Sequence, residues 1–268
     1  MKTAIKMALL ALTMTPLMAL AQQSFSTPEQ GANALVDAIS QKNDAALTEL
    51  LGENWQQFLP PEGVDPEAVA RFLRDWKVNH HVVTQSDIAW VDVGNAHWRL
   101  PIPLEKNKTG WQFNMATAQD EIITRTIGRN ELSAIQAMHA YVDAQLDYYQ
   151  LNQAWAQKLI SSEGKKDGLY WPIKPGEAPS PLGPNFSPAD YAEGYHGYHF
   201  RIIQESNEGE VALLAWPVTW GTTGIVSFIV DQDDQVYESN LGPNTEQQAQ
   251  DIKKFNPTPA QGWQVVRE

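Results

Sequence analysis

The stretch "GRNELSAIQAMHAYVDAQLDYYQLNQAWAQKLI", residues 128–160, decides the fold of the second half of the chain because it is the longest periodic segment. Mostly apolar side chains recur along it at steps of three and four, the spacing of one face of an α-helix. These residues are Leu132, Ile135, His139, Val142, Leu146 and Tyr149. Asn130 suits the N-cap position, so we expect a long helix to begin there and to lay this face against a sheet.

Alternating patterns after this segment predict four strands joined as an antiparallel meander. The segments are "YHFRIIQ" (198–204), "VALLAWPV" (211–218), "GIVSFIV" (224–230) and "QVYESN" (235–240). Residues 211–218 are apolar at nearly every position, which is typical of a central strand covered on both faces. The tail is expected to form a short helix within 245–255 and a strand-like end within 256–266.

The first half of the chain has the opposite order, with helices before strands. Two helices are predicted within 26–52, where Ser26 or Thr27 can cap the first, and a third over 65–77. Strands are predicted at 80–85, 87–93, 96–104 and 110–116, and Pro101 and Pro103 place the third at an edge or bulge. The fold class is therefore α+β: N-terminal helices with a curved antiparallel sheet, then a long helix packed on a four-stranded antiparallel meander.

The domain boundaries follow from these patterns. Residues 1–21 read as a signal peptide, with Lys2 and Lys6, an apolar run and the small-residue pattern Ala19-Leu20-Ala21 before a mature start at Gln22. Residues 22–127 form the helix and curved-sheet domain, and 128–268 form the long-helix domain with a proline-rich strap at 161–193. We therefore expect a periplasmic or secreted protein without a membrane span.

The composition narrows the classes of partner. The chain has no cysteine, which excludes disulfides and thiolate metal sites. Of the 19 basic residues two lie in the signal peptide, so the mature chain sets 17 against 32 acidic residues, a net charge of −15. An acidic surface repels phosphate backbones, so we expect no nucleic acid partner.

Aromatic side chains gather in and around the strap and supply the candidate binding residues. Rings with a polar edge are favoured at recognition surfaces. The candidates for ligand or partner binding are Tyr170, Trp171, Tyr195, His196, Tyr198 and Trp220. The alternative is that these rings anchor the strap to the sheet, because a long loop needs buried area to hold it.

Three histidines of the first domain, His80, His81 and His97, are candidate metal ligands. Adjacent strand residues face opposite sides, so at most one of His80 and His81 can meet His97. A zinc site needs further convergent ligands. His196 and His199, three apart in a strand or turn, point to opposite faces. We therefore predict no metal site and no cofactor.

The search for catalytic motifs gave none. There is no Gly-x-Ser-x-Gly elbow, and the "GTTG" of residues 221–224 is followed by a strand instead of the Lys and helix of a phosphate loop. The acidic turn Asp231 to Asp234 lacks the glycine and distal glutamate of a calcium loop, and weak calcium binding there stays open. No catalytic residue is predicted.

Several unusual motifs keep one order along the chain: "GRNELSAIQAMHAYVDAQLDYY", "DGLYWPIKPGEAPSPLGP", "GYHGYHFRI", "LLAWPVTWGTTGIVSFIV" and "VYESNLGP". Over roughly 110–255 the chain resembles a family of exported bacterial proteins catalogued only as a domain of unknown function. The long helix, strap and sheet are more distantly similar to the heads of type IV pilins and pseudopilins. The first domain is similar in element order to the cone-shaped nuclear-transport-factor-like fold, whose mouth often admits a small ligand.

The resulting expectation is a non-enzymatic binding or interaction protein of the cell envelope, whose partner is an envelope protein or a small ligand. The alternative is an envelope hydrolase whose site is assembled from residues too scattered to recognise. For the first we expect an aromatic and amide-rich cleft between the two domains, and for the second an acid–base pair within hydrogen-bond reach in that cleft.

Overall fold

The computed structural model describes residues 22–59, 63–183, 194–204 and 210–267. The predicted signal peptide, residues 1–21, and the end of the strap, 184–193, lie outside the described residues. The chain splits into two compact units, of which the first comprises residues up to 59 together with 64–118 and the second comprises the remainder.

Three helices precede the sheet of the first unit, as predicted. They are α1 (Pro28–Ser40), α2 (Asp44–Leu51) and α3 (Pro66–Val78), and a short 3-10 helix, η1 (Trp55–Phe58), follows α2. The side chain of Thr27 accepts a hydrogen bond from the N–H of Gln30, whose own side chain accepts from the N–H of Ser26. This reciprocal cap explains where α1 begins.

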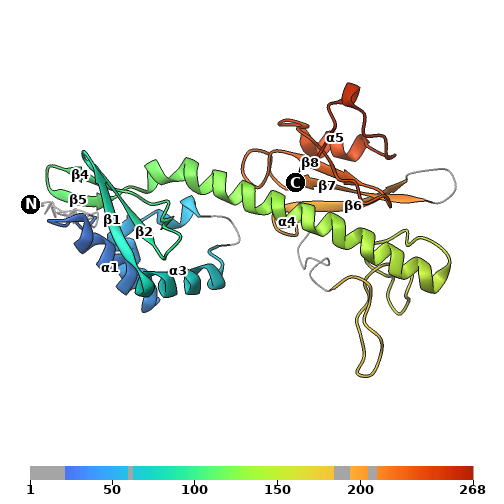
Figure 1. Cartoon of the computed structure of the whole chain (residues 1–268), viewed down its shortest axis with the longest axis horizontal. Coiled ribbons are helices and arrows are strands. Elements are labelled where there is room, and N and C mark those ends of the chain that lie inside the picture. The colour runs from blue at the N-terminus through green and yellow to red at the C-terminus, as the bar shows by residue number, and fades with distance from the viewer. Residues whose placement is uncertain (1–21, 60–62, 184–193, 205–209, 268) are drawn as a thin grey trace, which may run out of the picture. The chain divides into compact units, whose positions relative to one another are not determined.

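Five antiparallel strands form the sheet of the first unit (Figure 1). They are β1 (His80–Gln85), β2 (Ile88–Val93), β3 (Trp98–Arg99), β4 (Leu104–Asn107) and β5 (Gly110–Phe113). The order is β1-β2-β4-β5, and β3 pairs with β2. Pro101 and Pro103 lie between β3 and β4, so the strand predicted at 96–104 is broken where the prolines lack a donor.

The long helix α4 (Met115–Asn152) starts well before the predicted start. The side chain of Asn114 accepts a hydrogen bond of 3.1 Å from the N–H of Thr117, as an N-cap does. Asn130 lies inside the helix, where its side-chain amide donates to the carbonyl of Thr223 at 3.0 Å. The prediction of Asn130 as the cap was therefore wrong.

The buried face of α4 also differs from the predicted one. Leu132 is 65% exposed and Leu146 is 42% exposed, although Val142 is buried as expected. The buried face is next to the predicted one and carries small and polar residues among larger ones, namely Ala134, Met138, Tyr141, Gln145 and Tyr148. Alanines let a helix approach a sheet closely, which suits the dense packing of this core.

Five antiparallel strands form the second sheet: β6 (Tyr198–Gln204), β7 (Val211–Pro217), β8 (Ser227–Val230), β9 (Tyr237–Ser239) and β10 (Gln264–Val265). Their order is β10-β9-β8-β7-β6. The first four confirm the predicted meander, and the tail supplies a fifth strand through its pairing with β9.

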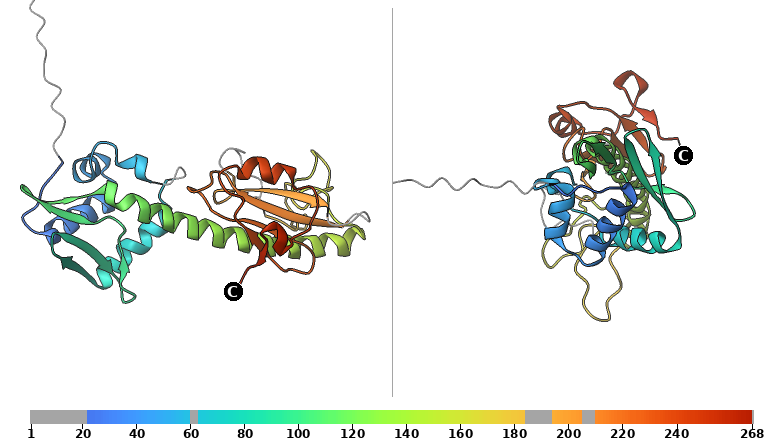
Figure 2. Two further views of the ribbon diagram at one scale, coloured as in Figure 1. Left: turned by 90° about the horizontal axis from the view of Figure 1, so that it is seen from above. Right: turned by 90° about the vertical axis from the view of Figure 1, so that its left-hand side faces the viewer.

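Both faces of β7 are covered, as the apolar run predicted. Leu213 and Ala215 share a core with α4, whereas Leu214 and Trp216 share another core with α5 (Thr245–Asp251). Figures 1 and 2 show α4 and α5 on opposite sides of this sheet. Within the second unit, the sheet is therefore the middle of three layers.

Candidate functional site

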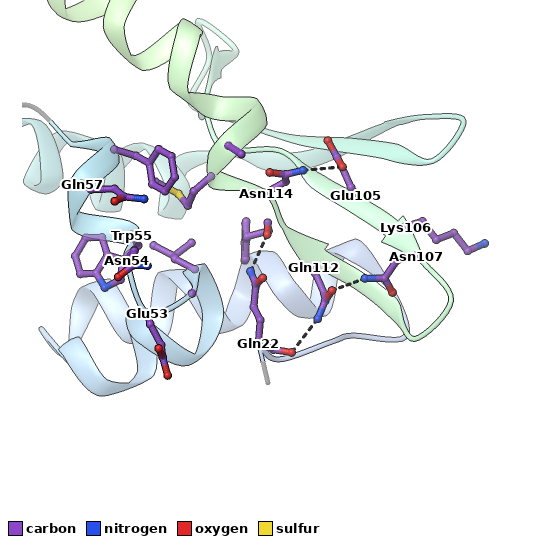
Figure 3. A pocket seen from close by; sticks show the side chains of 16 residues that line it. Gln22, Glu53, Asn54, Trp55, Gln57, Glu105, Lys106, Asn107, Gln112 and Asn114 are labelled. Carbon is purple, nitrogen blue, oxygen red and sulfur yellow. Dashed lines mark hydrogen bonds between the residues drawn. The ribbon is translucent and has the colours of Figure 1, made fainter. Parts of the chain in front are cut away.

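A hollow of about 480 Å³ opens in the first unit, between the end of α2 with η1 and the strands β4 and β5 (Figure 3). Its lining comes from four places in the sequence: Gln22, residues 51–58, residues 105–107 and residues 112–116. The volume lies within the range of small-molecule sites. It is the candidate functional site of the described chain.

A chain of side-chain amides forms one wall of the hollow. The amide of Gln22 donates to the carbonyls of Leu50 and Phe113, both at 2.7 Å. Gln112 in turn donates to the carbonyl of Gln22 at 2.8 Å, and the amide of Asn107 donates to the side-chain oxygen of Gln112. This network ties the first described residue to α2 and β5, so the wall is fixed before any ligand binds.

Two aromatic side chains lie on the opposite wall, among polar ones of the same segment. Trp55 and Phe58 of η1 are half-buried, and the indole N–H of Trp55 donates to the hydroxyl of Thr48 at 3.3 Å. Figure 3 shows Trp55 and Gln57 across the hollow from Gln112 and Asn114. An apolar surface facing a row of amides suits a ligand that has one apolar face and several hydroxyl or amide groups.

The carboxylate of Glu105 is held by its neighbours instead of being poised for proton transfer. One oxygen accepts from the amide of Asn114 at 2.8 Å, and the other accepts from the hydroxyl of Thr117 at 2.7 Å. The other charged lining residues, Glu53 and Lys106, are exposed. The hollow therefore offers hydrogen-bonding groups to a ligand, and the carboxylate of Glu105 at its wall already accepts two hydrogen bonds.

Three of the predicted binding residues lie in the core of the second unit. Tyr198 is fully buried and its hydroxyl donates to the carbonyl of Val226 at 2.8 Å. Burial, followed by the nearby charge of Glu131, raises the pKa of this phenol far above its usual value. Trp171 is 7% exposed, its indole N–H has no hydrogen-bond partner among the described residues, and Tyr170 packs against the same core.

The other three predicted residues lie nearer the surface. The rings of Tyr195 and His196 are 4.3 Å apart, and His196 is exposed. The indole of Trp220 donates to the side chain of Asn240 at 3.0 Å. The backbone pairs Tyr195 with Tyr198, so the structure joins two of the predicted positions there, and the role of all six in binding stays a prediction.

The strap contributes to the same core over its described part. Leu169 and Leu182 are buried, and their backbones are joined by a hydrogen bond of 3.0 Å. The backbone of Tyr170 bonds to Leu159 and Ser161 on either side of Ile160. Residues 161–183 are thus tied to the chain that leaves α4.

The histidines of the first unit lie as predicted. His81 meets His97 with ring centroids 5.0 Å apart, whereas His80 stacks on Trp76 at 3.8 Å. In the acidic turn, Asp231 accepts from the N–H of Asp233, and burial raises the pKa of Asp231. Within the part of the chain that the structure describes, no group of three His, Asp or Glu residues is arranged to hold a metal ion.

The sequence reasoning missed the residues of the hollow itself. No motif joins Gln22 to Trp55 and Gln112, because the three come together only through the packing of α2 on β5. The signals that were available are the tryptophan after Gly52 and the run of amides at 54–57, which are unusual for a plain connection.

Among the described residues, no helix combines the length and apolar character of a membrane span.

Comparison with known proteins places the chain in a family. No curated protein and no solved structure matches the chain. The sequence of residues 22–266 matches the family described as a protein of unknown function, DUF2950, and the chain belongs to that family.

Proposed function

We propose that this is an exported, non-enzymatic binding protein of the cell envelope that holds a small, uncharged polar ligand in the hollow of the first unit. The observation that carries the proposal is the pairing of an aromatic wall, Trp55 and Phe58, with an amide wall built on Gln22 and Gln112. The expected ligand has hydroxyl or amide groups on one side and an apolar face on the other, as a saccharide or a short peptide has.

Two further features support binding over hydrolysis. The oxygens of Glu105 accept hydrogen bonds from Asn114 and Thr117, which leaves this acid poorly placed to exchange a proton with a substrate. The order of helices before a curved sheet also supports a ligand at the mouth of a cone, as in the nuclear-transport-factor-like fold.

Export rests on the pattern of residues 1–21, which supports cleavage before Gln22.

Calorimetric titration of the mature chain with N-acetylglucosamine and its short β-linked oligomers tests the proposal, because these probes carry hydroxyls, an amide and an apolar ring face. We expect saturable binding that weakens at least tenfold in Trp55→Ala. The matched control is Trp155→Ala, a half-buried tryptophan of the second unit whose ring is tilted against that of Tyr149, with centroids 4.5 Å apart. Circular dichroism confirms that both variants fold.

The outcomes separate the hypotheses. Binding that Trp55→Ala and Trp155→Ala weaken equally would contradict a site in the hollow. Release of shorter saccharides on prolonged incubation would favour the hydrolase instead. No binding of these saccharides or of a short-peptide set would reject the proposed ligand class.

A further inference from the structure

A row of charged side chains crosses the sheet of the first unit away from the hollow. His81 on β1 is paired in register with Asp92 on β2, and Asp92 is paired with Arg99 on β3. Residues paired across antiparallel strands point to the same face of the sheet. The three side chains therefore lie side by side.

Arg99 already balances the charge of Asp92. Its Nε donates to one carboxylate oxygen at 2.7 Å and its Nη2 donates to the other at 2.9 Å, while its guanidinium lies 5.3 Å from the centre of the Trp90 ring. The side chain of Asp92 is only 8% exposed. A bidentate pair fixed in this way is close to neutral as a unit.

Two imidazoles lie beside this neutral pair. The Nε2 of His81 is 3.8 Å from the carboxylate of Asp92, and the ring of His97 meets that of His81 edge to face at 71°. His97 is exposed and has a φ of 53°, in the left-handed region that costs a non-glycine residue energy. The turn after Gly94 thus holds His97 over His81 in a conformation that the chain does not adopt freely.

The charge of this cluster depends on the two histidines. With both imidazoles neutral the four side chains sum to zero, and with both protonated they carry a net charge of +2. Asp75 of α3 is the acid that packs against the Gly94 turn, and it is paired with Arg74 at 3.0 Å. His80 faces the other side, against Trp76, so it does not add to the cluster.

We propose that His81 and His97 form a binding site for a doubly charged oxyanion, a sulfate or phosphoryl group, which fills when both imidazoles are protonated. Arg99 acts as a positioning residue, because it neutralises the carboxylate that would otherwise repel the anion. The site is independent of the hollow. Protonation of the imidazoles supplies the positive charge, so occupancy rises as the pH falls.

Sulfate is the probe of choice because it stays a dianion across this range. We expect calorimetric titration of the mature chain at constant ionic strength to show affinity at least tenfold higher at pH 5.5 than at pH 7.5. At pH 5.5, His81→Gln and His97→Gln should each weaken binding at least fivefold. His196→Gln, an exposed histidine of the second unit, is the matched control and should bind as the unmodified chain does.

One further variant guards against loss of binding through misfolding. Asp92→Asn leaves the charge of the Arg99 guanidinium unbalanced and should tighten sulfate binding, a gain that unfolding cannot imitate. Equal affinity at the two pH values, or binding in His97→Gln that matches the control, would overturn the proposal.

Sedimentation with vesicles of anionic phospholipid at pH 5.5 then distinguishes the two sources of the anion. Pelleting that His97→Gln abolishes indicates a lipid headgroup, and no pelleting indicates a soluble ligand.

Discussion

Glu131 on α4 accepts a hydrogen bond of 2.9 Å from the backbone N–H of Ile225, just before β8 begins. The same carboxylate oxygen accepts from the N–H of Val226 at 3.2 Å, and the neighbouring Asn130 donates to the carbonyl of Thr223. Two adjacent residues of the helix therefore hold the loop that enters the sheet. The motifs around residues 130 and 224 are far apart in the sequence, and these hydrogen bonds bring them into contact.

Replacing Glu131 with alanine should destabilise the second unit. The two backbone N–H groups would lose their acceptor in a half-buried place, which costs about 1–2 kcal/mol. Glu131→Gln keeps a side-chain acceptor and should lose less. Urea unfolding measures both, and Asp143→Ala, an exposed acid on the same helix, should change the free energy of unfolding by less than about 0.5 kcal/mol. Equal losses of unfolding free energy in Glu131→Ala and Asp143→Ala would contradict a stabilising role for the hydrogen bonds of Glu131.

The close approach of Gly224 to Tyr198 predicts a coupled pair. A Cβ at position 224 would collide with the phenol of Tyr198, whose hydroxyl is nearest. Gly224→Ala should therefore cost about 1–3 kcal/mol. Tyr198→Phe removes the nearest atom, so in the double variant the alanine should cost less than it does alone. A double-mutant cycle measures this difference, and strictly additive costs would show that the two sites are independent.

His199 gives the second unit a dependence on pH. Burial lowers the pKa of this imidazole, and the charge of Glu246 opposes the effect only in part. The unfolded chain then binds the proton more readily than the folded one, so stability is lost as the pH falls below the ordinary histidine value of about 6.5. The slope should reach up to about 1.4 kcal/mol per pH unit for one proton.

Thermal melts of the second unit between pH 7.5 and pH 5 test this prediction. His199→Gln should flatten the slope, because glutamine does not titrate. His196→Gln, the exposed neighbour, should leave the slope as it is. A slope that His199→Gln leaves unchanged would assign the effect to another group.

On the proposed cleavage before Gln22, the new terminus should keep an intact glutamine. An N-terminal glutamine cyclises when its amine attacks the side-chain carbonyl carbon and ammonia leaves. In the folded chain the amide of Gln22 is held by the carbonyls of Leu50 and Phe113. We expect intact-mass analysis of the exported protein to show a start at Gln22 without loss of ammonia. Rapid cyclisation in the folded protein, at the rate found after denaturation, would contradict this anchoring.

The sequence predicted the sheets well because strand patterns are strong where both faces are covered. Every residue of Val211–Pro217 is buried, and an unbroken apolar run is a direct sign of such a strand. The reciprocal cap at Thr27 is likewise local, so it could be read from neighbouring residues.

The face of α4 could not be predicted because hydrophobicity alone decided the choice. Gln145 is 1% exposed, and its amide exchanges two hydrogen bonds of 2.9 Å with the backbone of Ala156. A buried amide paired in this way costs little, yet it looks like a surface residue in the sequence. Leu132 misleads in the opposite direction, because it looks like a core residue in the sequence and is 65% exposed in the structure.

The hollow was beyond prediction for a different reason. Its walls meet through the contact of Gln22 with α2 and β5, and such long-range pairs leave no periodic trace. The aromatic residues in and around the strap form a visible compositional signal, but Trp171 and Tyr198 are buried in the core.

Mapping ligand contacts by NMR shows whether the ligand occupies the hollow of the first unit. The mature chain, labelled with ¹⁵N, is titrated with the N-acetylglucosamine oligomer that binds most tightly. We expect shifts confined to the indole N–H of Trp55, the side-chain amides of Gln57 and Gln112, and the backbone of 51–58 and 105–116. Saturable shifts that instead cluster around Trp220 and His196, with the resonances of Trp55 unmoved, would contradict it.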